Sequence, residues 1–141
     1  MPKLQVINMQ SRNFRYTKSF VIDGFESLQS ITIGNECFYD SSKNENTYSC
    51  TISNCPLLSS IAFGSYAFYY YSVFDLQNVP NLQSITMNGN NFKESSILQI
   101  NRTIYKSLLK IRFIQFQTII KIHKHWSILF PKCYAVYYYW I

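Results

Sequence analysis

The chain has 141 residues, enough for one domain, and its 48% hydrophobic and 18% aromatic content can supply a core. Only 14% of its residues are charged, against about 25% in typical soluble domains. The net charge of +6 is uneven: residues 1–94 hold all seven acidic and six basic residues, whereas residues 95–141 hold seven basic residues and no acid.

The N-terminal segment, residues 1–18, lacks the continuous apolar stretch of a secretory signal. The chain also lacks a run of about twenty apolar residues, the length of a transmembrane helix. These features therefore leave the compartment unpredicted.

One apolar motif occurs four times in the first hundred residues. The repeats begin at Leu4, Leu28, Leu58 and Leu82, here repeats 1 to 4, and continue with apolar residues 3, 5 and 10 positions after the leucine. The leucines are separated by 24, 30 and 24 residues. The six extra residues fall in the polar segment 40–49, where a loop insertion leaves the framework intact.

The apolar residues at positions 3 and 5 alternate with polar ones, which is typical of a short strand with one apolar face. Such a strand buries that face by stacking on the same strand of the next repeat, so we expect a parallel sheet along one side. The phenylalanine at position 10 should recur at one height and form an aromatic spine. Gly34, Gly64 and Gly89 follow the predicted strands, where we expect tight turns.

A second apolar pair lies eight and six residues before a leucine position. These pairs are Phe20 and Ile22, Cys50 and Ile52, Phe74 and Leu76, and Leu98 and Ile100. Each repeat therefore has a second pair of apolar residues, two positions apart, in addition to the leucine motif.

The fourth repeat, LQSITMNGNNF, resembles the leucine-rich-repeat signature L-x-x-L-x-L-x-x-N-x-L, with phenylalanine in the last slot. The Ser-Ile pair, the glycine and the phenylalanine are similar to BspA-like repeats of surface proteins from protists and some bacteria. The resemblance covers residues 2–100. It implies an α/β or mainly β repeat solenoid, a right-handed coil with a stacked parallel sheet, and it suggests the cell surface.

The sequence departs from that family at one position. Asn90 matches the signature asparagine, but Arg12, Glu36 and Tyr66 replace it in the other repeats. The ladder of buried asparagine amides that the resemblance implies should therefore be mostly missing.

Residues 101–141 form a basic, aromatic tail. Continuing the 24-residue count reaches Lys106, Leu109, Ile111 and Phe116, three of which are apolar. Three interpretations stay open: degenerate capping repeats, a segment without evolved structure, or a basic segment that binds membrane surfaces or nucleic acid.

No catalytic motif or nucleotide-binding loop occurs in the chain, so we expect no enzymatic activity, cofactor, metal or small-molecule substrate. His123 and His125 lack the further ligands of a metal site. Cys37, Cys50 and Cys55 are expected to be buried free thiols. A Cys37–Cys55 or Cys50–Cys55 disulfide stays open for an exported protein.

The residues expected to face outward from the strands are small and uncharged, and they form the candidate binding surface. They are Ser30, Thr32, Ser60, Ala62, Ser84, Thr86 and Asn88. A tyrosine group, Tyr66, Tyr69, Tyr70 and Tyr71, is either an interface anchor or filling for the spine.

These features predict a protein-binding module whose partner is unidentified. Because Leu4 already lies within a repeat, we expect a fragment of a longer surface or scaffold protein. The alternative is a protein that associates with membranes or nucleic acid through its basic tail.

Overall fold

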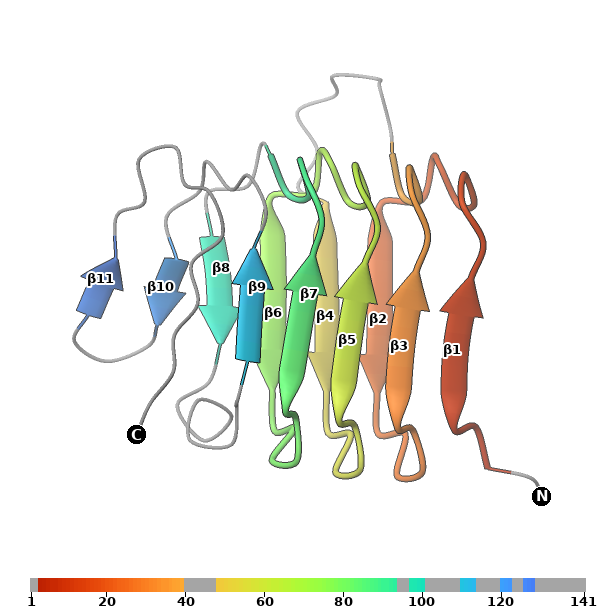
Figure 1. Cartoon of the computed structure of the whole chain (residues 1–141), viewed down its shortest axis with the longest axis vertical. Helices are drawn as coiled ribbons and strands as arrows, with labels where there is room; N and C mark the ends of the chain where they lie inside the picture. The colour runs from red at the N-terminus through yellow and green to blue at the C-terminus, as the bar shows by residue number, and fades with distance from the viewer. Residues whose placement is uncertain are drawn as a thin grey trace.

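The computed structural model describes residues 3–39 and 48–93, and the backbone of strands at 97–100, 110–113, 120–122 and 126–128. The described strands form two sheets (Figure 1). Sheet A has the order β1 (Val6–Met9), β3 (Ser30–Ile33), β5 (Ser60–Phe63), β7 (Ser84–Met87) and β9 (Lys110–Phe113). Sheet B has the order β11 (Trp126–Ile128), β10 (Ile120–Ile122), β8 (Ile97–Ile100), β6 (Val73–Gln77), β4 (Ser49–Ser53) and β2 (Ser19–Asp23).

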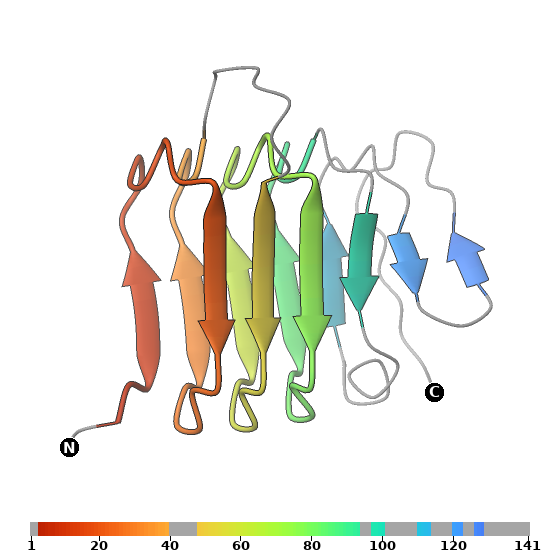
Figure 2. The ribbon, with the colours of Figure 1, turned by 180° about the vertical axis from the view of Figure 1, so that it is seen from behind.

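Up to β8, successive strands alternate between the two sheets, running up in sheet A and down in sheet B (Figures 1 and 2). The predicted parallel sheet is confirmed as sheet A, in which Ile31 is paired with Ile61 and Ile61 with Ile85. All pairings within the described residues are parallel except that of β10 with β11. Of the two predicted fold classes, the described residues have the mainly β one, because they contain no helix.

Sheet B was not predicted, although the second apolar pair of each repeat marks its strands. Phe20 is paired with Cys50 and Cys50 with Phe74, and the isoleucine or leucine two residues later follows the same register. Buried and exposed residues alternate along β2, so the face with Phe20 and Ile22 is buried against sheet A and the face with Val21 is exposed. Repeats 1 to 3 therefore each have two apolar strand faces that pack in one core, and the backbone of β8 continues sheet B in repeat 4.

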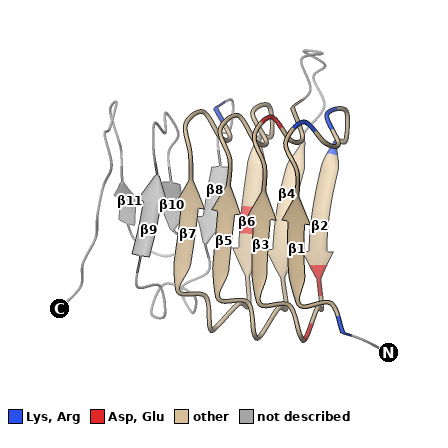
Figure 3. Ribbon diagram, turned by 45° about the vertical axis from the view of Figure 1, so that its right-hand side comes forward, with Lys and Arg blue, Asp and Glu red and all other residues tan. Residues whose placement is uncertain are grey.

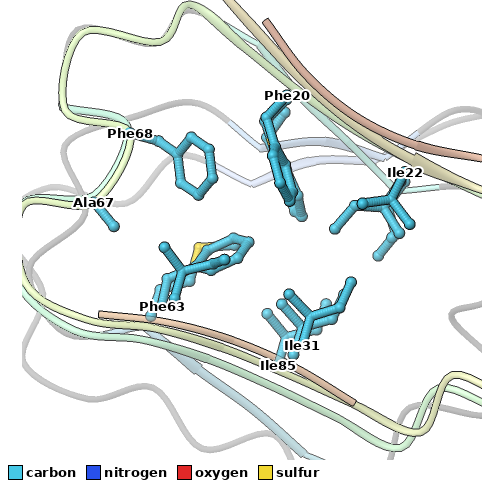
Figure 4. Packing of buried hydrophobic residues seen from close by; sticks show 14 of the residues in the cluster. Phe20, Ile22, Ile31, Phe63, Ala67, Phe68 and Ile85 are labelled. Atoms are coloured by element: carbon cyan, nitrogen blue, oxygen red, sulfur yellow. The ribbon is translucent and has the colours of Figure 1, made fainter. Parts of the chain in front are cut away.

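The core lies between the two sheets (Figure 4). Phe20 and Ile22 from sheet B face Phe63 and Ile31 from sheet A, and Phe68 lies in the turn at one side. The framework leucines Leu28, Leu58 and Leu82 are completely buried. Fully burying a side chain of this kind stabilises the fold by roughly 1.5–3 kcal/mol.

The predicted aromatic spine is confirmed. The rings of Phe14 and Phe38 stack with centroids 5.5 Å apart, those of Phe38 and Phe68 at 4.6 Å, and those of Phe68 and Phe92 at 5.2 Å. The angles between these ring planes are 10°, 4° and 3°. Each such contact adds about 0.5–1.5 kcal/mol beyond the burial of apolar area.

The turns after the sheet A strands depart from the leucine-rich-repeat pattern. In each repeat the residues at positions 8 and 10 have positive φ; for Tyr66 and Phe68 the values are 60° and 55°. Position 8, which carries the family asparagine, therefore holds exposed Arg12 and Tyr66. In repeats 2 to 4 the buried side chain is one residue later, and in repeat 4 the amide of Asn91 donates to the backbone oxygen of Asn88 at 2.5 Å.

The glycines after the strands serve a different purpose from the one predicted. Neither Gly34 nor Gly64 has a positive φ. A Cβ at Gly34 would instead lie 2.6 Å from the backbone nitrogen of Ser11, and one at Gly64 would lie 2.6 Å from that of Asn35. Stacking on the preceding repeat, not tight turning, therefore requires these glycines. Asn88 occupies this position in repeat 4, so the requirement is not uniform.

Strands from the segment beyond residue 100 extend both sheets. Ile111 is paired with Ile85 and Phe113 with Met87, a step of 26 residues. The predicted 24-residue step, which placed Ile111 opposite Met87, was therefore wrong by two residues. Lys106 and Phe116 lie outside the described residues, as do His123, His125 and Cys133.

Candidate interaction surface

The predicted binding residues lie together on the outer face of sheet A. The strand register aligns Ser30, Ser60 and Ser84 in one row across the sheet. It aligns Thr32, Ala62 and Thr86 in a second row, and Asn88 is exposed just after β7. These seven residues, called the outer strip below, are exposed or half-buried, whereas the strand residues between them are buried.

The outer strip contains hydroxyl groups and no charge. Its serine and threonine side chains can donate and accept hydrogen bonds, and covering them does not require a charge to be removed from water. The rows continue in register to Val6 and Asn8 on β1 and to Lys110 and Arg112 on β9. At β9, each uncharged row of the sheet therefore continues into a position occupied by a basic residue.

A tyrosine cluster lies in the turns that follow the sheet A strands. The ring of Tyr39 is 5.3 Å from that of Tyr69 and 5.6 Å from that of Tyr70. Tyr66 stacks on Tyr69 at 5.8 Å, and Tyr69 and Tyr70 are 4.6 Å apart in an edge-to-face arrangement. Tyr66 is 42% exposed, and the other three are half-buried.

The predicted tyrosine group is thus divided between the surface and the core. Tyr71 is fully buried, packs edge-on against Phe68 and donates its hydroxyl to the backbone oxygen of Thr17. Tyr66, Tyr69 and Tyr70 lie at the surface, where Tyr39 joins them. Tyr71 therefore fills the core beside the spine, whereas the role of the other three as interface anchors stays a prediction.

The predicted tyrosine group did not include Tyr39, because that group contained only residues close together in the sequence. The repeat register does identify Tyr39 as a member. Position 11 holds Arg15, Tyr39, Tyr69 and Lys93 in repeats 1 to 4. The Arg15 guanidinium lies over the Tyr39 ring at 5.6 Å, and the Lys93 ammonium lies over the Tyr69 ring at 5.4 Å. This row, called the aromatic ladder below, has two tyrosine rings in contact, tilted by 52° to each other, with a cation over each ring.

Charged residues separate between the two turn edges of repeat 1. Arg12, Arg15 and Lys18 lie in the turn between β1 and β2, with Glu36 of repeat 2 bonded to Arg12 at 3.1 Å (Figure 3). The opposite edge holds Asp23 and Glu26, with Lys3 at 3.8 Å from Glu26. One edge is therefore basic and the other acidic.

Asp23 begins a polar ladder along the acidic edge. Its carboxylate accepts hydrogen bonds from the Ser53 hydroxyl at 2.7 Å and the Asn54 amide at 2.8 Å. The amide of Asn78 donates in turn to the Asn54 side-chain oxygen at 2.7 Å. The bonds from Ser53 and then Asn54 lower the pKa of Asp23, because they stabilise its charged form.

Cys37, Cys50 and Cys55 are buried free thiols in the structure. Burial raises the pKa of Cys50 well above its ordinary value, and burial also raises that of Cys55. A thiol must lose its proton to act as a nucleophile, so neither of these two is activated.

Two classes of functional feature are absent from the described part of the chain. There, no three histidine, cysteine or acidic side chains are grouped as metal ligands. Those same residues include no helix long and apolar enough to cross a membrane.

Comparison of the chain with protein-family models, with characterised proteins and with solved structures found no match. The resemblance to leucine-rich repeats thus depends on the framework residues themselves.

Proposed function

We propose that the chain is a leucine-rich-repeat-like solenoid, part of a surface or scaffold protein, that binds another protein and is not catalytic. Its contact surface is the aromatic ladder together with Tyr66, Tyr70 and the adjoining outer strip. The observation that carries this proposal is the accessible tyrosine cluster, in which four rings contact one another at the surface. The in-register repeats support the solenoid, since stacked repeats present extended binding surfaces.

The chemistry of this surface suits a protein partner. Tyrosine provides a large apolar ring and a hydroxyl while losing little conformational entropy, and it is enriched in protein interfaces. Contacts between the rings already restrict their rotamers, so binding has less ordering left to do. Tyr66 lies four residues after Ala62 of the outer strip, which makes the two surfaces neighbours along repeat 3.

A selection experiment tests the proposal even though the partner is unidentified. The whole chain would be used to select binders from a displayed random peptide library, and the affinity of enriched peptides would be measured. We expect Tyr66→Ala to weaken binding about 30-fold, as expected for an interface hot spot worth about 2 kcal/mol. Thr86→Lys should weaken the same peptides, because it places a charge in the uncharged outer strip.

Tyr16→Ala is the matched control, since Tyr16 is 75% exposed and lies in the turn of repeat 1, outside the tyrosine cluster. It should leave peptide affinity unchanged. A selection that yields no binders, or binders indifferent to both Tyr66→Ala and Thr86→Lys, would contradict the proposal.

The second candidate function is binding of anionic membranes or nucleic acid through the basic tail. The observation that favours it is the alignment of Lys110 and Arg112 with the rows of the outer strip. Here the chain should bind anionic vesicles or oligonucleotides with an affinity that falls steeply with salt. Lys110→Gln with Arg112→Gln should reduce that affinity. Substitution is preferable to deletion, because β9 and β10 pair with the preceding strands.

A further inference from the structure

The chain contains one Asn-Gly pair, Asn88–Gly89, which lies directly after β7. Asn88 is exposed and belongs to the outer strip. An asparagine that precedes glycine can react with its own backbone, because the nitrogen of the next residue attacks the side-chain amide carbon. Glycine has no Cβ to hinder that approach. The pair is therefore a candidate site of spontaneous chemical modification.

Neither reacting group of this pair is held by a hydrogen bond within the described part of the chain. There, the Asn88 side-chain amide has no partner and the Gly89 nitrogen donates to no acceptor. The segment is anchored through other atoms. The Asn88 nitrogen donates to the Phe63 oxygen at 3.0 Å, and the Gly89 oxygen accepts from the Tyr66 nitrogen at 2.9 Å. The turn is therefore fixed in place while the reacting nitrogen stays accessible to the side chain.

The Asp-Gly pair at the acidic edge, Asp23–Gly24, shows the opposite arrangement. The Gly24 nitrogen donates to the backbone oxygen of Ser53 at 3.2 Å. The Asp23 carboxylate accepts a hydrogen bond from the Ser53 hydroxyl at 2.7 Å. Both the nitrogen and the side chain are thus restrained there, whereas the corresponding groups of Asn88–Gly89 are not. The structure therefore distinguishes two pairs that differ little in sequence.

We propose that Asn88 is a modification site that converts spontaneously to aspartate and isoaspartate in the folded chain. A base from the solvent removes the Gly89 N–H proton, and the nitrogen forms a bond to Cγ of Asn88. The bond between Cγ and the amide nitrogen breaks, and the amide nitrogen leaves as ammonia after taking a proton from the solvent. Water then adds to one carbonyl of the five-membered imide and breaks its bond to the Gly89 nitrogen. Addition at Cγ gives aspartate, and addition at the backbone carbonyl carbon gives isoaspartate; neither needs an oxidant or a reductant.

Either product changes the candidate interaction surface. A carboxylate replaces the Asn88 amide and adds a negative charge to the uncharged outer strip. Isoaspartate also adds a methylene to the backbone before Gly89, whose oxygen accepts from the nitrogen of the exposed Tyr66. The resulting loss of partner binding rests on the proposed function, whereas the modification itself involves only this chain and water.

Peptide mapping by mass spectrometry measures the reaction at each asparagine after the whole chain is incubated at neutral pH. We expect Asn88 to convert in the folded chain at a rate within about tenfold of its rate in urea, because folding places no hydrogen bond on the Gly89 nitrogen. Gly89→Ala should slow the conversion by at least about tenfold, since the added Cβ hinders the attack. Circular dichroism verifies that each variant is folded.

Asp23→Asn is the matched control. It creates a second Asn-Gly pair in which the Gly24 nitrogen donates to the backbone oxygen of Ser53. In the folded variant, position 23 should convert at least about tenfold more slowly than Asn88, whereas in urea the two positions should convert at similar rates. The comparison separates the effect of the fold from that of the dipeptide sequence within one molecule.

Two results would overturn the proposal. They are conversion of Asn88 that is more than about tenfold slower in the folded chain than in urea, and conversion at position 23 of the folded variant that is as fast as at Asn88. A separate measurement addresses binding: Asn88→Asp should weaken the peptides selected on the wild-type chain by about tenfold. Unchanged peptide affinity, with Asn88 converting as expected, would contradict the proposed function and leave the modification site standing.

Discussion

Repeat 1 and repeat 3 have the same framework residues but very different burial. Leu4 and Phe14 are exposed by 44% and 56%, whereas the equivalent Leu58 and Phe68 are fully buried. Repeat 3 has neighbours on both sides in both sheets, while the described strands of repeat 1 are paired on one side only. The difference shows that a repeat has no core of its own, and that the interfaces between repeats supply the stability.

The spine phenylalanines should show this difference most strongly. Phe68 is stacked between Phe38 and Phe92 and is fully buried, so Phe68→Ala should lower the free energy of unfolding by about 3–5 kcal/mol. Phe14→Ala removes one stack and a half-exposed ring, so it should cost about 1 kcal/mol. Urea unfolding at low protein concentration measures both. Equal costs would contradict the idea that inter-repeat contacts dominate stability.

The glycine position separates repeats 1 and 3 in a second way. A Cβ at Gly64 would meet the backbone of Asn35, so Gly64→Ala should destabilise the fold by about 1–3 kcal/mol. Repeat 1 has Gln10 at this position, where the structure describes no preceding turn. Gln10→Ala is therefore the control and should change the unfolding midpoint little. A neutral Gly64→Ala would show that the turns can move apart at no cost.

Cysteine labelling tests whether the end repeat opens before the inner ones. Cys37 is buried and donates to the backbone oxygen of Gln10 in repeat 1 at 3.0 Å, whereas Cys50 lies in β4 between β2 and β6. In single-cysteine variants, a thiol reagent should modify Cys37 at least about tenfold faster than Cys50, because local opening needs less free energy than global unfolding. Both should react much more slowly than in urea. Equal rates would indicate that all repeats open together.

The smallest effect is expected at Asp23. Hydrogen bonds from Ser53 and Asn54 lower its folded-state pKa below the ordinary value of 3.8. Its contribution to stability is therefore present above the ordinary pKa and is lost as the pH falls through the lowered value. The difference in unfolding midpoint between wild type and Asp23→Ala should be small at neutral pH and should shrink in strong acid. A difference that does not depend on pH would show that these hydrogen bonds do not depend on the charge.

The four-repeat framework could be predicted because apolar spacing reflects burial directly. Leu58, Ile61, Phe63 and Phe68 follow from position alone, and the six extra residues between repeats 2 and 3 do not disturb the register of Ile31 with Ile61. The outer strip follows from the same alternation, since residues between buried strand positions must face outward. Its use in binding stays a prediction.

The aromatic ladder could not be grouped by neighbouring residues in the sequence. Its members lie 24 or 30 residues apart in the sequence: Arg15, Tyr39, Tyr69 and Lys93. Only the stacking of one repeat on the next brings their side chains together. The step to β9 was missed because hydrogen bonding, not a fixed count, sets the register, so two extra residues are absorbed in the connection.

The sequence by itself determined which residues form the apolar face of each sheet A strand and the aromatic spine, since the strand period and the recurring phenylalanine encode them. Only the tertiary structure decided that a second sheet closes the core, that Gly34 and Gly64 make room for the preceding turn, and that repeat 1 leaves its apolar face exposed. These properties depend on what lies against a repeat. The repeat's own residues specify a face to be covered, whereas the neighbour determines whether it is.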